Sequence, residues 1–131
     1  PSVVEEWGIA GRVGWIDLDL RRLLGSPKRP LEQQSVSRFP SSDIDLAFEV
    51  DDAVPATAVE ATLRAAVGDL LASLRLFDVY RGPGISPGRR SLAYTLRLEA
   101  LDHTLTDAEV AEVRTRAIAA VESAHAATLR G

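Results

Sequence analysis

The chain has 131 residues, a formal net charge of −4 at neutral pH and no cysteine. This length suits one compact domain with an extension and is too short for two full cores. The acidic balance argues against a protein that coats nucleic acid or membrane through bulk positive charge, and the lack of cysteine excludes disulfides, thiolate zinc sites and iron–sulfur clusters.

The first predicted element is a strand over residues 13–20, where Ile16 and Leu18 alternate with Asp17 and Asp19. No nearby segment offers this strand a partner. Prolines and a polar cluster then interrupt all periodicity, which indicates a linker over residues 25–40. The sequence therefore predicts an N-terminal extension over residues 1–34 and a main domain over residues 35–131.

The main domain opens with a strand and a short amphipathic helix. In residues 42–50, apolar side chains alternate with mostly polar ones, as in a strand with one buried face. The side chains expected to be buried are Ile44, Leu46, Phe48 and Val50. Pro55 suits a first helical residue, Val59, Leu63 and Val67 recur at a spacing of four, and Gly68 suits the end of the helix.

The second half of the domain predicts a hairpin, a long helix and a last short strand. Residues 75–81 and 91–100 flank a loop rich in glycine and proline. Thr106 and Glu109 form a capping box, with Leu105 and Val110 as its hydrophobic staple. The helix that starts there has one apolar side, made of Val110, Val113, Ala117, Val121 and Ala124. The tail "HAATLR" is mildly β-prone.

The resulting order is β-α-β-β-α-β, which is typical of an α+β, ferredoxin-like sandwich: a four-stranded antiparallel sheet with two helices on one face. The other sheet face is left open. The alternation assigns to it a polar or small set: Asp43, Asp45, Ala47, Asp78, Tyr80, Ser91, Ala93 and Thr95.

Catalytic and metal-binding patterns are weak. His103 and His125 lack partners at metal-ligand spacing and are expected in surface or capping roles. Ser91, Asp102 and His103 supply the residue types of a triad, but no G-x-S-x-G elbow accompanies them. Asp51 and Asp52 are expected just before the first helix, where their negative charges interact favourably with the positive end of the helix dipole.

The arginines of the predicted hairpin are the residues that most suggest a function. Arg81, Arg89, Arg90 and Arg97 fall in a segment with no carboxylate between Val79 and Leu98. Beside Tyr80 and an open sheet face, they fit a surface for single-stranded RNA, which stacks bases on aromatic rings and holds phosphates with arginines. A solvated basic edge that discourages sheet extension fits equally well.

Four motifs carry a family resemblance: "SRFPSSDIDLAF", "LFDVYRG", "GRRSLAYTLRL" and "HTLTDAEV", in this order. Together they closely resemble the C-terminal anticodon-binding domain of the phenylalanyl-tRNA synthetase β subunit, over residues 35–131. Upstream, "GRVGWIDLDLRRLL" resembles the closing strand of the synthetase-like module that precedes this domain. With no methionine in the chain, we expect a fragment of a longer polypeptide.

The resemblance implies a tRNA-binding module that contacts the anticodon stem-loop of phenylalanine tRNA during aminoacylation. Its partner is then the synthetase α subunit in an α2β2 enzyme, and the location is cytoplasmic, with no membrane partner. Catalysis is not expected in this segment, nor is a cofactor, whereas ATP and magnesium are expected for the parent enzyme. The alternative is a ferredoxin-like domain that senses a small molecule or docks a protein.

The expected RNA-binding residues follow the matched motifs: Arg38, Phe39, Tyr80, Arg81, Arg89, Arg90, Ser91 and Ala93. Arg89 and Arg90 are expected at phosphates, and Tyr80 at the border of a base-binding surface. The chain departs from the family in two places. Asp43 and Ile44 stand where basic residues are usual, and His103 stands where arginine is common.

Overall fold

The structure, a computed structural model, describes residues 2–11, 13–27 and 37–130. The chain divides into two units, Pro1–Gln33 and Gln34–Gly131, and each is described by itself. Within the described ranges, no helix combines the length and the apolar character needed to cross a membrane. Most of the predicted linker lies outside the described residues.

The first unit holds two short helices, α1 (Ser2–Glu6) and α2 (Leu20–Gly25). Asp19 caps α2 by accepting hydrogen bonds from the backbone N–H groups of Arg21 at 3.0 Å and Arg22 at 3.3 Å. The predicted strand over residues 13–20 is wrong, since these residues form no ladder. A strand needs a partner for its backbone groups, and the described part of this unit offers none. Several apolar side chains are consequently exposed: Trp7, Trp15, Ile16, Leu18 and Leu24.

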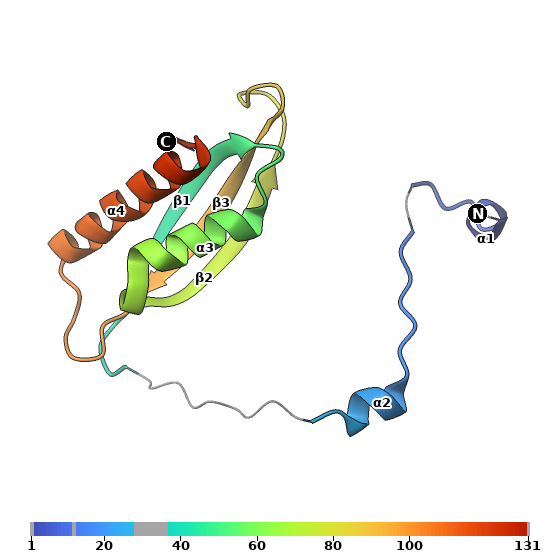
Figure 1. Cartoon of the computed structure of the whole chain (residues 1–131), viewed down its shortest axis with the longest axis horizontal. Helices are drawn as coiled ribbons and strands as arrows, with labels where there is room; N and C mark the ends of the chain where they lie inside the picture. Colours follow the sequence, from blue (N-terminus) through green and yellow to red (C-terminus); the bar gives the residue numbers. More distant parts are fainter. Residues whose placement is uncertain (1, 12, 28–36, 131) are drawn as a thin grey trace. The chain divides into compact units, whose positions relative to one another are not determined.

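The second unit is a four-stranded sheet covered by two helices on one face (Figure 1). The strands are β1 (Ser42–Asp51), β2 (Leu71–Tyr80), β3 (Arg89–Leu98) and β4 (Thr128–Arg130), in the order β2-β3-β1-β4 with antiparallel pairing throughout. The helices are α3 (Ala56–Val67) and α4 (Asp107–His125), and a 3₁₀ turn (Gly68–Leu70) follows α3. This arrangement confirms the ferredoxin-like β-α-β-β-α-β fold.

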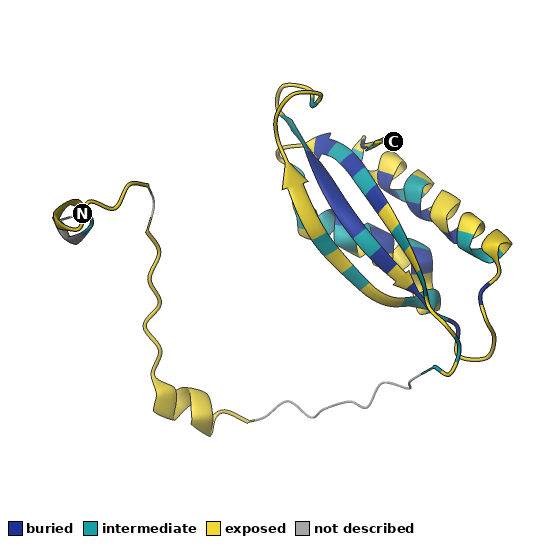
Figure 2. Ribbon diagram, turned by 180° about the vertical axis from the view of Figure 1, so that it is seen from behind, coloured by how far each residue is buried: buried dark blue, intermediate teal, exposed yellow. Residues whose placement is uncertain are grey.

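The core lies between the sheet and the helices. It is formed by alternate residues of β1 and β3 and by one side of each helix: Leu46, Phe48, Val50, Leu92, Tyr94, Leu96, Leu98, Val59, Leu63, Val67, Val113, Ala117 and Val121. Seen from behind, the buried residues of the sheet lie on the central strands β1 and β3, whereas the edge strand β2 is mainly exposed (Figure 2). Ala124, expected on the buried side of α4, is exposed.

Helix ends largely follow the sequence signals. Thr106 begins α4 with the predicted capping box: its Oγ1 accepts from the N–H of Glu109 at 3.3 Å, and a Glu109 carboxylate oxygen accepts from the N–H of Thr106 at 2.8 Å. Gly68 ends α3 with φ of +70°, a conformation that favours glycine. Pro55 is the N-cap of α3 and not its first helical residue, which shifts that start by one position.

Candidate functional site

The sheet face opposite α3 and α4, called here the open face, presents the side chains that alternate with the core positions. Directly opposed residues share a face, so the register fixes its composition: Asp45 faces Thr95, Ala47 faces Ala93, and Tyr80 faces Ser91. All eight residues predicted for this face lie on it. Glu49, Asp51, Ser73, Arg75, Arg89 and Arg97 complete the same face of β1, β2 and β3.

Tyr80 ends β2 and lies against the hairpin loop that follows it. Its hydroxyl donates to the carbonyl of Pro83 at 3.3 Å, and a Cβ at Gly82 would stand 2.7 Å from the same oxygen. A side chain at that position would collide with the tyrosine, which explains the glycine. The residue is still 38% exposed. Tyr80 is therefore held by the loop through its hydroxyl and remains partly exposed.

Small side chains border this ring. Ser91, directly opposite Tyr80, is 5% exposed, and Ala93 is 8% exposed. Both residues are therefore largely covered by neighbouring side chains, and Tyr80 is the exposed member of this group. A partly exposed aromatic ring can stack against another planar group.

Arg89 belongs to a partly buried network of hydrogen bonds and not to the free surface. Its guanidinium donates to the carbonyls of Glu49 at 2.7 Å and Ala126 at 3.0 Å, and its Nε lies 3.2 Å from the Glu49 carboxylate. The same carboxylate accepts from the N–H of Ser86 at 3.3 Å. Hydrogen bonds from Ser86, assisted by the charges of Arg89 and Arg130, hold the pKa of Glu49 below its usual range. Arg89 therefore joins β1, the hairpin loop and the end of α4.

Arg90 points to the opposite side of the sheet. It pairs in register with the core residue Val50, and its guanidinium donates to the carbonyl of Val54 at 2.7 Å. Its Nε is buried without a hydrogen-bond partner among the described residues. This arginine faces the helices, so its guanidinium does not contribute to the open face.

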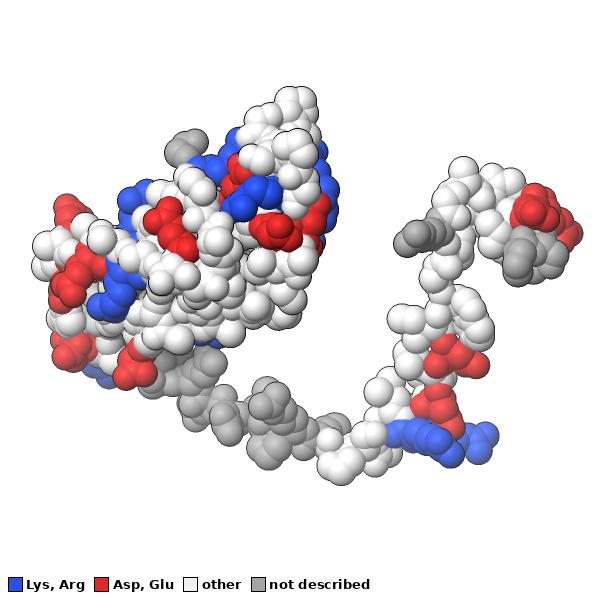
Figure 3. Space-filling view, turned by 45° about the horizontal axis from the view of Figure 1, so that its top comes forward, with Lys and Arg blue, Asp and Glu red and all other residues white. Residues whose placement is uncertain are grey.

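The four arginines of the hairpin do not gather into one cluster. Arg81 pairs with Asp52 at 2.9 Å, and Arg97 pairs with Asp43 at 2.7 Å. Because Arg89 and Arg97 stand eight positions apart on β3, their backbones are about 26 Å apart. The segment that lacks carboxylates in sequence receives them from residues 43–52. On the helix side of the second unit, acidic and basic side chains are likewise interspersed (Figure 3).

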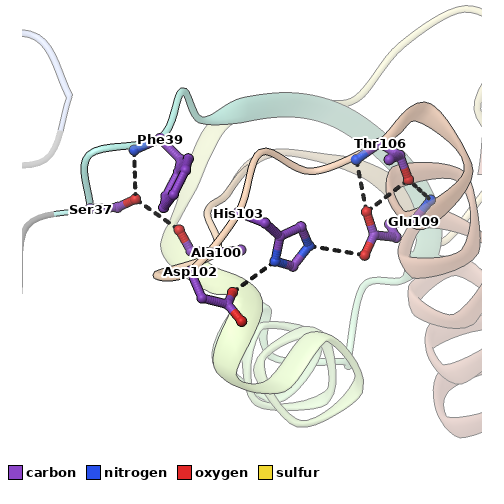
Figure 4. Close-up of polar contacts among 7 residues, drawn as sticks. All are labelled: Ser37, Phe39, Ala100, Asp102, His103, Thr106 and Glu109. Carbon is purple, nitrogen blue, oxygen red and sulfur yellow. Dashed lines mark hydrogen bonds and ion pairs between the residues drawn. The ribbon is translucent and has the colours of Figure 1, made fainter.

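Arg38 and Phe39 lie in the segment just before β1, where Figure 4 shows Phe39. The hydroxyl of Ser37 donates to the carbonyl of Ala100 at 2.8 Å and accepts from the N–H of Phe39 at 3.0 Å. Ala100 follows the end of β3 that is remote from Tyr80. The predicted site residues thus divide between two ends of the sheet: Tyr80, Arg81, Arg89, Ser91 and Ala93 at one end, with Arg38 and Phe39 at the other.

His103 forms the most charged network of the domain (Figure 4). Its Nδ1 lies 2.7 Å from Asp102 and its Nε2 lies 3.0 Å from Glu109, the residue of the capping box. Hydrogen bonds to Asp102 and Glu109 raise the pKa of His103, and bonds from Thr106, together with His103, lower the pKa of Glu109 to about 2. The imidazole thus supports the start of α4.

The residue types of a catalytic triad are not assembled. His103 contacts Asp102 in the loop before α4, whereas Ser91 lies near the other end of β3, opposite Tyr80. Across the described ranges, no three His, Asp or Glu side chains are grouped so that they could hold a metal ion.

One feature of the open face is absent from the sequence predictions. A shallow polar hollow of about 240 Å³ lies at the end of the sheet remote from Tyr80, and its lining residues are Asp43, Ser73, Arg75, Thr95 and Arg97. These residues come from three strands, so only the register brings them together. The sequence signal for the hollow is the alternation of β2, which assigns Ser73 and Arg75 to one face.

Comparison with known proteins gives a consistent result. Residues 37–130 match the ferredoxin-fold anticodon-binding domain family. The chain is 41% identical over 131 residues to the phenylalanine–tRNA ligase beta subunit of Thermobifida fusca, and 42% identical over 131 residues to that of Nocardia farcinica. It is 40% identical over 131 residues to the same subunit of Geobacillus kaustophilus. Each alignment covers 100% of this chain and 16% of the relative.

Proposed function

The chain belongs to the ferredoxin-fold anticodon-binding domain family, and from this premise we propose that it binds the anticodon stem-loop of phenylalanine tRNA. The observation that carries the proposal is the open face at Tyr80, where an accessible ring stands beside the small side chains of Ser91 and Ala93. Unstacked bases of single-stranded RNA bind to such surfaces by stacking.

The contacts divide by chemistry. A base stacks on Tyr80 above Ser91 and Ala93, and Arg81, whose ion pair with Asp52 is about half exposed, meets a phosphate beside it. Arg89 and Arg90 are occupied by Glu49 and by backbone carbonyls, so we assign them to the framework of the site. Arg38 and Phe39, at the remote end of the sheet, contact a different part of the RNA.

The longer protein supplies the remaining activities in this proposal. The family resemblance implies a cytoplasmic α2β2 phenylalanine–tRNA ligase, in which the α subunit carries the aminoacylation site with its ATP and magnesium. This chain acts in tRNA recognition without a catalytic step of its own. The exposed apolar side chains of residues 4–27 pack against the synthetase-like module that precedes the domain.

A titration of the 131-residue chain with fluorescent anticodon stem-loop RNA tests the proposal. The phenylalanine stem-loop should bind more tightly than a non-cognate one. Tyr80→Ala should weaken binding by ~1–3 kcal/mol with little change in salt dependence, because stacking releases few counterions. Leu101→Ala, which changes an exposed apolar residue outside the sheet, is the matched control.

Equal affinity for cognate and non-cognate RNA, with no effect of Tyr80→Ala, would overturn the proposal. Dimerisation driven by a small molecule, without RNA binding, would favour the sensing-domain alternative.

A further inference from the structure

The polar hollow on the open face combines a fixed ion pair with a free cation. Arg97 is held by Asp43 through two bonds, from Nε to Oδ1 at 2.8 Å and from Nη2 to Oδ2 at 2.7 Å. These bonds use two of the five N–H donors of the guanidinium. The hydrogen bond from Arg97 lowers the pKa of Asp43, so the pair remains charged at neutral pH. The remaining N–H donors of the Arg97 guanidinium are available beside the hollow.

Arg75 is the cation without a partner. Within the described ranges it takes part in no hydrogen bond and no ion pair, and the hydroxyl of Ser73 likewise has no hydrogen bond. The lining side chains Arg75, Arg97 and Asp43 together carry one net positive charge. Asp45 lies on the β1 side, where it accepts from the hydroxyl of Thr95 at 2.7 Å. The excess positive charge is therefore on the β2 side of the hollow.

We propose that this hollow binds one phosphodiester group of the RNA strand whose base stacks on Tyr80. A phosphodiester carries a single negative charge and accepts hydrogen bonds, which matches the net charge of the lining and the free donors of Arg75 and Ser73. The inference rests on the proposed function and extends it, because the hollow lies outside the residues assigned to RNA above.

The geometry of β2 gives the strand a path. Arg75 and Tyr80 lie on the same face of this edge strand, opposite Thr95 and Ser91, which are four positions apart on β3, a separation of about 13 Å. RNA that follows β2 from the base site to the hollow passes one carboxylate, Asp78, on the same face, whereas a path over β1 would pass Asp45 and Glu49. The hollow then fixes the direction in which the strand leaves Tyr80.

The test measures affinity for the anticodon stem-loop as a function of salt concentration. Arg75→Ala should weaken cognate and non-cognate binding alike, roughly tenfold, and should reduce the salt slope by about 0.7–0.9, the value for one lost contact. Arg75→Lys should retain most of the slope. Arg64→Ala removes an exposed arginine of α3, on the other side of the sheet, and should change neither quantity.

A chemical substitution in the RNA identifies the phosphate. One neutral methylphosphonate linkage is placed at successive positions of the loop. At one position it should weaken binding to the parent chain and leave binding to Arg75→Ala unchanged, as expected when both changes remove the same contact.

The outcomes separate the two proposals. If Tyr80→Ala weakens binding while Arg75→Ala behaves like Arg64→Ala, the hollow is not a phosphate site, Arg75 is a solvated edge residue, and the proposed function stands. If the parent chain binds neither RNA, the proposed function and this inference are both overturned.

Discussion

The guanidinium of Arg89 donates a 3.0 Å hydrogen bond to the carbonyl of Ala126, the residue that ends α4 in a left-handed conformation with φ of +46°. A cation at this position gives a carbonyl at the helix end a hydrogen-bond donor. It is also attracted by the negative end of the helix dipole. The contact also holds the chain where it turns from α4 into β4. An arginine that resembles a phosphate ligand in the sequence is thus part of the framework.

Arg89→Ala should lower the free energy of unfolding by ~1.5–3 kcal/mol, because it removes charge-assisted hydrogen bonds and leaves the largely buried carboxylate of Glu49 without its cation. Urea unfolding measures the change. Arg81→Ala breaks a more exposed ion pair and should cost only about 0–1 kcal/mol. Equal losses in the two variants would contradict a framework role for Arg89.

Thr106→Ala should destabilise the domain by ~1 kcal/mol, because the N–H of Glu109 loses its side-chain acceptor. Thr115→Ala is the matched control within the same helix: its hydroxyl donates to a carbonyl of the helix itself, and alanine has the higher helix propensity. That variant should be neutral or slightly stabilised. If the two variants unfold at the same urea concentration, α4 does not depend on its capping box.

His103 should make stability depend on pH. Its pKa is raised from 6.5 in the folded chain by Asp102 and Glu109, so the stabilising contribution is complete below 6.5 and is lost as pH rises through the folded value. The difference in free energy of unfolding between the parent and His103→Gln should therefore be larger at about pH 5.5 than at about pH 8.5, with the parent more stable. Urea unfolding at both pH values gives this difference. A gap that is independent of pH would mean that the charge of the imidazole contributes nothing.

Tyr94 should titrate late. Burial raises its pKa to about 12, with the charge of Glu60 acting in the same direction, and its hydroxyl donates to the carbonyl of Ala56 at 3.1 Å. The neutral form is favoured in the folded chain, so stability is lost as pH rises from 10 toward 12. Ultraviolet titration of Tyr80→Phe isolates this group, since the chain has two tyrosines. A titration midpoint near 10, in a chain that circular dichroism shows to be still folded, would contradict the burial of Tyr94.

Local patterns predicted the fold of the domain because they report short-range physics. The alternation around Phe48 and Tyr94 identified the central strands, and the spacing of Thr106 and Glu109 identified the start of α4. The same alternation around Ile16 failed. Period-2 spacing states which side chains share a face, but a strand also requires a neighbour for its N–H and C=O groups, and residues 13–20 have none among the described residues of this unit.

The candidate site was harder to predict because its electrostatics are non-local. Arg89 and Arg97 appear unpaired when only the hairpin is considered, yet their carboxylates, Glu49 and Asp43, are about 40 or more positions earlier in the chain. The hollow depends on the same long-range register, together with irregularities in β2 between Leu71 and Ser73 and between Leu76 and Asp78. Such irregularities leave no clear trace in residue types.

The charged residues near the two ends of the β1–β3 ladder have a further consequence for how the chain folds. Alternation alone cannot distinguish the native alignment from a shift of two residues, because such a shift keeps every core residue on its face. In the native alignment Asp43 faces Arg97 and Asp51 faces Arg89, which gives two pairs of opposite charge. A shift in one direction would set Arg97 against Asp45 but Asp43 against Glu99, and a shift in the other would set Arg89 against Glu49 but Arg97 against Ser41. Each shifted alignment keeps one such pair, so these surface charges, each worth little to the finished domain, favour the native pairing of the two central strands over its nearest alternatives.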